Sequence, residues 1–250
     1  MKPSLKKRLV AGETLIGTVI TLPSPEIAEI LAAAGFDWLF VDLEHSALDF
    51  QSAQALLQAA GNKIFCVIRC PSNEEVWIKK SLDLGADGLI IPQVRSAQDA
   101  ERAVQFSRYP PLGARSVGMA RAQGYGQTFQ HYIDSANDDI ALILQAEHIE
   151  AIANIASILQ VPGIDCVFVG PYDLSGSMGK IGQVTDPGVL EAIAAVRQAC
   201  LSANVPLGIF GATPDSVRPY ISQGFKLIAV GIDVMVMGSA ARSIVRALRS

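Results

Sequence analysis

Two apolar runs in the middle of the chain each lead to a carboxylate. Residues 140–144 lead to Glu147, and residues 166–169 lead to Asp173. Runs of this length, rich in Ile, Val and Leu and followed by a helical pattern, predict buried parallel strands. Neighbouring parallel strands lie about 4.8 Å apart, so the two carboxylates could reach one cation, for which Mg²⁺ or Mn²⁺ is better suited than Zn²⁺. The alternative is that each carboxylate caps the helix that follows it.

Further polar side chains follow apolar runs. Asp42, Glu44 and His45 follow one run, Arg69 and Gln93 follow two others, and Gln145 follows residues 140–144. A carboxylate can fix the tautomer of an imidazole and raise its basicity, so Asp42 and His45 form a candidate acid/base pair. Glu44 either shares that role or holds water. Arg69 is either an ion-pair partner of these carboxylates or a fixed cation for an anionic substrate. No lysine follows any run, which argues against a Schiff-base aldolase and favours a metal for carbonyl chemistry.

The elements that must position these residues alternate regularly along the chain. We expect strands at 15–20, 38–41, 64–68, 88–91, 140–145, 166–169, 207–210 and 227–230. Helical patterns cover 25–34, 50–60, 73–84, 96–107, 129–137, 149–159, 187–203, 213–223 and 234–249. Eight such units predict a single (β/α)₈ TIM barrel over residues 1–250, with catalytic groups at the C-terminal ends of its strands. An open Rossmann sheet would carry a GxGxxG turn after the first strand, and this chain has none there.

One segment, 109–126, interrupts the alternation with four Gly and two Pro. A loop of this length within a compact domain is usually functional or disordered. Its Arg121 is a further candidate to reach the site.

Composition and charge exclude several classes of protein. The chain has 250 residues, half of them hydrophobic, which is enough for one large core. Its net charge of −4 argues against a nucleic-acid partner. The four cysteines form no CxxC pair and are interpreted as reduced core thiols of a cytoplasmic protein. No signal-peptide core and no membrane-spanning run is expected, since the most hydrophobic stretch, 227–241, is broken by Gly231, Asp233 and Gly238.

Several segments carry a resemblance to a known family. They are Ala33-Ala-Gly-Phe-Asp-Trp38, Val41-Asp-Leu-Glu-His45, Val67-Ile-Arg69, Gly85-Ala-Asp-Gly88, Arg108-Tyr-Pro-Pro-Leu-Gly-Ala-Arg115, Gln145-Ala-Glu147 and Gly170-Pro-Tyr-Asp-Leu-Ser175. Together they make the chain resemble, over nearly its whole length, the HpcH/HpaI class II aldolases, which are metal-dependent pyruvate aldolases. Departures from the family pattern include Leu43, Ala146 and His148, and they bear on which aldehyde is accepted.

The resemblance implies a role for each candidate residue. Glu147 and Asp173 would bind Mg²⁺, Mn²⁺ or Co²⁺, while Arg69 would contact the pyruvyl oxygen. His45 with Asp42 would form the acid/base dyad, with Glu44 beside it. The other implied substrate contacts are Gln145, Phe210 and the segment Gly170, Pro171, Tyr172 and Asp173.

The function expected from the residues and the resemblance is cleavage of a 4-hydroxy-2-oxo acid to pyruvate and an aldehyde, and the reverse condensation. A citrate-lyase-like or oxaloacetate-decarboxylating member of the same superfamily is one alternative, because one enolate site serves several reactions. A catalytically idle barrel is another. The resemblance also implies a homo-oligomer, typically a hexamer or trimer of dimers, in which the last helix, about 234–249, is exchanged between subunits.

Overall fold

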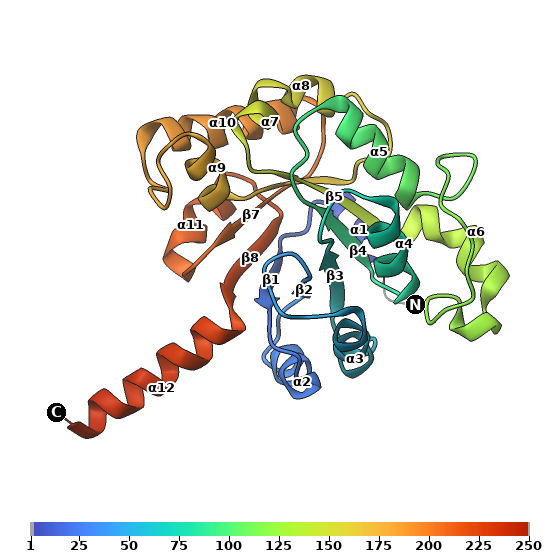
Figure 1. The fold of residues 1–250 in the computed structure, drawn as a ribbon. Coiled ribbons are helices and arrows are strands. Elements are labelled where there is room, and N and C mark those ends of the chain that lie inside the picture. The colour runs from blue at the N-terminus through green and yellow to red at the C-terminus, as the bar shows by residue number, and fades with distance from the viewer. Residues whose placement is uncertain (1–2, 250) are drawn as a thin grey trace.

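The computed structural model describes residues 3–249 and confirms the expected closed barrel. Eight parallel strands pair in chain order, and β8 pairs with β1 (Figure 1). The strands are β1 (Leu15–Ile20), β2 (Trp38–Asp42), β3 (Phe65–Arg69), β4 (Gly88–Ile91), β5 (Ala141–Ala146), β6 (Cys166–Val169), β7 (Leu207–Gly211) and β8 (Leu227–Ile232). Each agrees with its predicted range to within two residues at either end.

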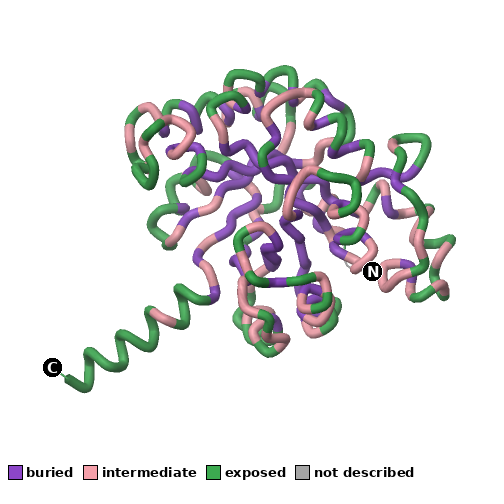
Figure 2. The backbone as a smooth tube through the Cα atoms, in the orientation of Figure 1, coloured by how far each residue is buried: buried purple, intermediate pink, exposed green. Residues whose placement is uncertain are grey.

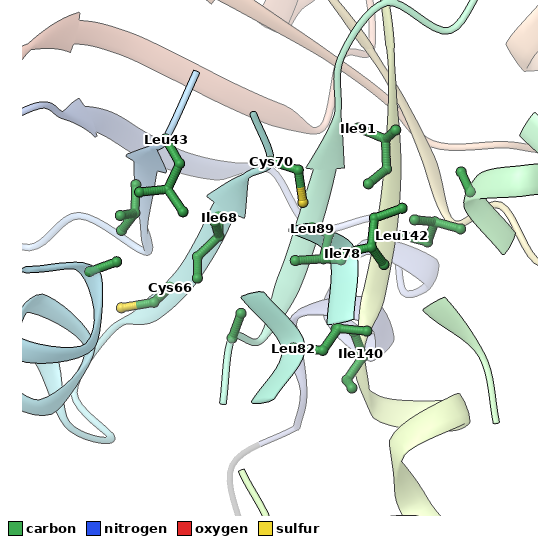
Figure 3. Close-up of a cluster of buried hydrophobic side chains, with 14 of the residues drawn as sticks. Leu43, Cys66, Ile68, Cys70, Ile78, Leu82, Leu89, Ile91, Ile140 and Leu142 are labelled. Carbon is green, nitrogen blue, oxygen red and sulfur yellow. The ribbon is translucent and has the colours of Figure 1, made fainter. Parts of the chain in front are cut away.

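Helices surround the barrel and cover the outer faces of the strands. They are α1 (Leu5–Val10), α2 (Pro25–Ala33), α3 (Phe50–Ala60), α4 (Glu75–Asp83), α5 (Ala97–Ser107), α6 (Phe129–Asp139), α7 (Ile149–Ala153), α8 (Ile155–Ile158), α9 (Pro171–Ser177), α10 (Pro187–Ser202), α11 (Pro214–Ser222) and α12 (Asp233–Arg249). Between helices and strands lies a layer of buried aliphatic side chains, of which Ile68, Ile78 and Leu89 are examples (Figure 3). Burial of this layer removes apolar surface from water and is the main force that holds the helices on the barrel.

Large aromatic rings fill the barrel interior. Trp38 and Phe168 meet edge to face with their centroids 6.3 Å apart. The backbone opposite each ring is glycine: a Cβ on Gly17 would lie 2.6 Å from the Trp38 ring, and one on Gly208 would lie 2.5 Å from the Phe168 ring. These two glycines are therefore required by close packing rather than by backbone flexibility.

Two helices that the sequence did not predict complete the fold. Leu5 and Leu9 of α1 are fully buried and pack with the residues of the barrel interior, so α1 closes one end of the barrel. The helix α9 begins at Pro171, directly after β6. A helix of six or seven residues shows too few turns for its periodicity to stand out. For the same reason the predicted helix 149–159 conceals a break at Asn154, which divides α7 from α8.

Side chains cap the starts of α3 and α5 but not that of α2. Asp49 and Ser96 accept hydrogen bonds from backbone N–H groups in the first turns of α3 and α5. Ser24 precedes α2 but its hydroxyl donates to the Glu26 carboxylate instead of capping the helix. Pro25 starts α2 without a free N–H, so fewer donors there need a partner.

The segment 109–126 is ordered around one buried cation. The guanidinium of Arg115 lies over the Tyr109 and Tyr132 rings, at 4.4 and 5.4 Å from their centroids, and donates to Asp83 at 3.0 Å. Arg121 of the same segment donates to the Leu84 carbonyl at 2.6 Å. Leu84 precedes β4, so Arg121 lies at the opposite end of the barrel from the strand C-termini. The suggestion that Arg121 reaches the site is wrong.

The last helix, α12, leaves the barrel instead of packing on it (Figure 1). From Val234 to Arg249 none of its residues is buried (Figure 2). Asp233 anchors its start, because its carboxylate accepts hydrogen bonds from the Thr21 hydroxyl and from the N–H groups of Thr21 and Leu22. Within residues 3–249 no helix is both long and apolar enough to cross a membrane. The four cysteines are buried free thiols, as expected.

Candidate active site

A cavity of about 230 Å³ opens at the C-terminal ends of the strands, where the sequence places its polar residues. Its lining includes Asp42, His45, Arg69, Gln145, Asp173 and Phe210, together with Gly170, Pro171 and Tyr172. Residues from five strands or their following loops therefore converge on one space. Glu44 contacts Arg69 at the edge of this cavity. Glu147 lies beside the cavity and, together with Asp173, lines an adjoining hollow. The structure brings together every residue that the sequence singled out for chemistry except Arg121.

Asp42 and Arg69 form a buried, two-point ion pair. The strand register places their Cα atoms opposite each other on β2 and β3. Arg69 Nε donates to Asp42 Oδ1 at 2.9 Å and Nη2 donates to Oδ2 at 2.7 Å. Burial alone would raise the pKa of the Asp42 carboxyl, but the guanidinium and two backbone N–H donors outweigh it and hold that pKa below its usual value. Asp42 is therefore ionised, and both of its carboxylate oxygens accept hydrogen bonds.

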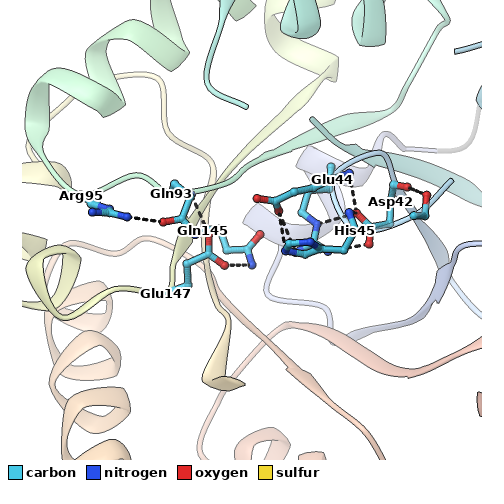
Figure 4. A network of polar contacts seen from close by, with 9 residues as sticks. Asp42, Glu44, His45, Gln93, Arg95, Gln145 and Glu147 are labelled. Carbon is cyan, nitrogen blue, oxygen red and sulfur yellow. Dashed lines mark hydrogen bonds and ion pairs between the residues drawn. The ribbon is translucent and has the colours of Figure 1, made fainter. Parts of the chain in front are cut away.

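The predicted contact between Asp42 and the His45 imidazole is not made in this structure. Asp42 Oδ1 instead accepts the backbone N–H groups of Glu44 and His45, at 3.0 and 3.2 Å. The physical reason is that the fork of Arg69 offers two parallel charged donors, which a single imidazole N–H cannot match. The imidazole is largely exposed, and its Nε2 lies 3.8 Å from the Glu44 carboxylate (Figure 4).

Glu44 therefore takes the place next to His45 that was expected for Asp42. Its Oε2 lies 3.3 Å from Arg69 Nη1 and makes no hydrogen bond. Burial raises the pKa of the Glu44 carboxyl, because desolvation outweighs the attraction of Arg69. A carboxyl with a raised pKa at the mouth of a cavity is a candidate for proton exchange with a bound molecule.

Glu147 is buried at the end of β5, and amide groups surround it. Its Oε1 accepts the backbone N–H of Gln93 at 2.8 Å and the Gln93 side-chain amide at 2.9 Å, while Gln145 donates to Oε2 (Figure 4). Gln93 directs its N–H to Glu147 from a left-handed backbone conformation, with φ of 56°. Glu147 does not cap the following helix, since His148 accepts the N–H of Glu150 there. No role for Gln93 was predicted from the sequence, because a residue pattern does not reveal the left-handed backbone that directs its N–H to Glu147.

The charge state of Glu147 depends on its burial and on its acidic neighbours. The pKa of this carboxyl is raised to about 7, chiefly by desolvation. The nearby Glu44 and Asp173 carboxylates contribute to the rise, and the Gln93 N–H and Arg69 oppose it. Three acidic groups thus repel one another across a small space beside a single guanidinium, that of Arg69. A cation placed there would relieve this repulsion.

The residues present fit an open divalent-metal site. Glu147 and the exposed Asp173 line one hollow from neighbouring strands β5 and β6. Gln145 has a buried side-chain oxygen without a hydrogen-bond partner. A Cβ on Gly170 would lie 3.1 Å from Glu147 Oε2, so only glycine leaves this oxygen accessible. Within residues 3–249 no three acidic, histidine or cysteine side chains enclose a metal. Two carboxylates with the other positions left for water and substrate suit Mg²⁺ or Mn²⁺.

Comparison with known proteins assigns the family. Residues 16–240 match the family described as HpcH/HpaI aldolase/citrate lyase. The chain belongs to this family. It is 40% identical over 248 residues to a 4-hydroxy-2-oxo-heptane-1,7-dioate aldolase from Salmonella heidelberg, covering 98% of this chain and 94% of that protein. It is 39% identical over 236 residues to a 4-hydroxy-2-oxovalerate aldolase from Rhodococcus jostii, covering 94% and 91%.

A solved structure supports the same assignment. A HpcH/HpaI family protein from Burkholderia cenocepacia J2315 superposes with a TM-score of 0.94 at 37% identity, covering 98% of this chain and 99% of that one. The family and the fold expected from the sequence are confirmed. The expected enzyme class, an aldolase that cleaves a carbon–carbon bond, is confirmed as well. Members of this family depend on a divalent metal.

Proposed function

We propose that this enzyme cleaves 4-hydroxy-2-oxo acids to pyruvate and an aldehyde, and that Glu147 and Asp173 hold the divalent metal on which it depends. The observation that carries the proposal is the arrangement of these two carboxylates around one hollow, beside the cavity that contains Arg69. An anionic 2-oxo acid placed there meets positive charge at the site where negative charge builds up during cleavage. The names of the two curated relatives support this substrate class.

Cleavage requires that negative charge on the pyruvyl fragment be stabilised more than the bound substrate itself. When bound, the metal supplies a Lewis acid for the 2-oxo group. Arg69 supplies a second fixed positive charge, already neutralised in part and oriented by Asp42. Because the ion pair with Asp42 fixes the guanidinium, its position needs no reorganisation as charge develops.

The carboxylate of the substrate lies, in this proposal, against Gln145 and the segment 170–173. Tyr172 and Asp173 occupy the first turn of α9, where backbone N–H groups have no partner within the helix. Gly170 allows close approach because it carries no side chain. These donors orient the 2-oxo acid so that its reacting bond faces the cavity.

His45 is the proposed group that takes the proton of the 4-hydroxyl. Its imidazole is exposed at the cavity, so it can reach substrate and then exchange the proton with water. Glu44 at 3.8 Å stabilises the imidazolium that forms. Asp42 contributes indirectly, since it accepts the His45 N–H and so fixes the loop that carries the imidazole.

The proposal is tested by measuring pyruvate release from 4-hydroxy-2-oxo acids after removal of metal by EDTA and after its replacement by Mg²⁺ or Mn²⁺. We expect activity to disappear with EDTA and to return with the metal. Oxaloacetate and citryl substrates are tested in parallel. Full activity in excess EDTA would refute the metal assignment, and turnover of oxaloacetate without turnover of hydroxy-oxo acids would favour the decarboxylase or lyase alternative.

We also propose that α12 packs on another copy of this chain. Met237, Ala241, Ile244, Val245 and Leu248 are exposed and recur at helical spacing along one side of α12. An apolar stripe on a helix without a partner in its own barrel is typical of an interface. Exchange of this helix between subunits follows from the family resemblance.

A further inference from the structure

A second hollow, of about 490 Å³, adjoins the cavity of the proposed site. It lies between α9, α10 and α11, on the side of the barrel formed by β7 (Figure 1). Pro171, Tyr172 and Phe210 line both spaces. The Tyr172 and Phe210 rings stand between them with centroids 6.0 Å apart and planes tilted by 54°. We call this second hollow the α10 groove.

The α10 groove is apolar. Its walls include Val184, Leu190, Ile193, Ala194, Ala212 and Pro219. The charged side chain among its lining residues is Asp215, which is exposed and pairs with Arg218 at 3.2 Å. No lysine or arginine lines the groove within the described residues 3–249. A carboxylate or phosphate at this place would therefore lose its water without gaining a positive partner.

We propose that the α10 groove binds the tail of the aldehyde, and that the preferred acceptors are aldehydes with an unbranched alkyl or aryl tail and no second anionic group. This inference rests on the proposed aldolase function and names its substrate class. In the proposed function the substrate carboxylate lies against Gln145 and the segment 170–173. Phe210 lines both the cavity and the groove, so a substituent on C4 that extends past Phe210 enters the groove.

The chemistry of cleavage leaves the tail on C4 free to bind in the groove. The bond between C3 and C4 breaks, its electron pair stays on C3 as the pyruvate enolate, and the 4-hydroxyl loses its proton as C4 becomes the aldehyde carbon. Protonation of C3 then gives pyruvate. The substituent on C4 takes no part in these steps, so it contributes only by binding. Each methylene group that the groove buries adds about fourfold to kcat/KM through the hydrophobic effect.

The test measures kcat/KM for condensation of pyruvate with propanal, hexanal, octanal and succinic semialdehyde. We expect kcat/KM to rise from propanal to octanal and to be no higher for succinic semialdehyde than for propanal. Leu190→Asp places a charge in the groove and should lower kcat/KM for octanal at least tenfold, mainly through KM, while propanal is unaffected. Leu201→Asp is the matched control, because Leu201 is also an exposed leucine on α10 but lines a different hollow.

Two outcomes overturn the inference while the aldolase function stands. One is a kcat/KM that does not depend on chain length. The other is a Leu190→Asp protein whose oligomeric mass by light scattering falls while its preference for octanal is kept, which would make the groove a contact between copies. If no aldehyde, propanal included, condenses with pyruvate, the proposed function itself fails, and the inference with it.

Discussion

Asp42 and Arg69 face each other across neighbouring strands and share two hydrogen bonds, of 2.9 and 2.7 Å, in a nearly buried setting. The pair sets the position of the cavity's central cation. It also explains why the backbone amides of Glu44 and His45, and not the imidazole, occupy the remaining side of Asp42. Its energetics can be measured separately from its catalytic effect.

Removing Asp42 should strongly destabilise the protein. In Asp42→Ala the Arg69 guanidinium stays buried with only the more distant Glu44 as a partner, and such a loss costs about 3 kcal/mol of unfolding free energy. Replacing both residues, as in Asp42→Ala with Arg69→Met, should cost less than Asp42→Ala alone, because no buried charge remains. Urea unfolding of wild type, Asp42→Ala, Arg69→Met and the double variant measures this. Strictly additive single effects would show that the pair is not coupled.

Replacing Arg69 should impair turnover more than stability. Arg69→Lys keeps a positive charge but loses the planar fork that Asp42 orients. We expect kcat to fall on the order of 10²-fold, as for loss of an oxyanion donor, with a smaller change in KM. Steady-state kinetics of pyruvate release measures it, with Arg102→Ala, an exposed arginine on α5, as the control. An unchanged kcat in Arg69→Lys would contradict the role assigned to the guanidinium.

The metal-free protein should lose stability as pH rises toward and beyond neutrality. The pKa of Glu147 is raised from 4.5 to about 7 in the folded state, so the folded protein holds a proton that the unfolded chain releases. Its contribution is fully present below pH 4.5 and is lost as pH rises through 7, for a total of about 3 kcal/mol. Thermal unfolding in EDTA from pH 5 to 8 tests this. Glu147→Gln should flatten the profile, and an equally steep profile in that variant would contradict the assignment.

Loss of either proposed metal ligand should weaken metal binding. We expect Glu147→Gln and Asp173→Asn each to lower Mn²⁺ affinity by more than about 100-fold, the upper end of the loss seen for outer-shell partners. Isothermal titration calorimetry with Mn²⁺ measures this directly and does not depend on activity. Asp138→Asn, on α6 and exposed, is the control. Wild-type affinity in both site variants would place the metal elsewhere.

The apolar stripe of α12 should determine the oligomeric state. Val245→Asp introduces a charge into the stripe and is expected to lower the mass of the assembly measured by light scattering. Ser243→Asp adds the same charge on the opposite side of the helix and should leave the mass unchanged. Equal masses for wild type, Val245→Asp and Ser243→Asp would show that α12 is not the contact.

The sequence by itself determined the class of fold and the rim on which the site lies. Alternation of apolar runs with helical patterns is a local signal, and it predicts a parallel barrel because each strand needs a crossover helix. A polar residue just after an apolar run is also a local signal, because both can be recognised within a short stretch of sequence. Glu147 and Asp173 were therefore assigned to one end of the barrel without any coordinates, and the family resemblance added their chemistry.

Only the tertiary structure decided which of these side chains contact each other. The partner of Asp42 depends on the register between β2 and β3, which joins residues 27 positions apart in the chain. The donors around Glu147 depend on a left-handed backbone at Gln93. Hydrogen bonds of this kind are chosen by geometry among several chemically suitable partners, and the order of residues along a chain does not specify that geometry. The apolar groove beside Phe210 likewise exists only because α9, α10 and α11 come together around β7.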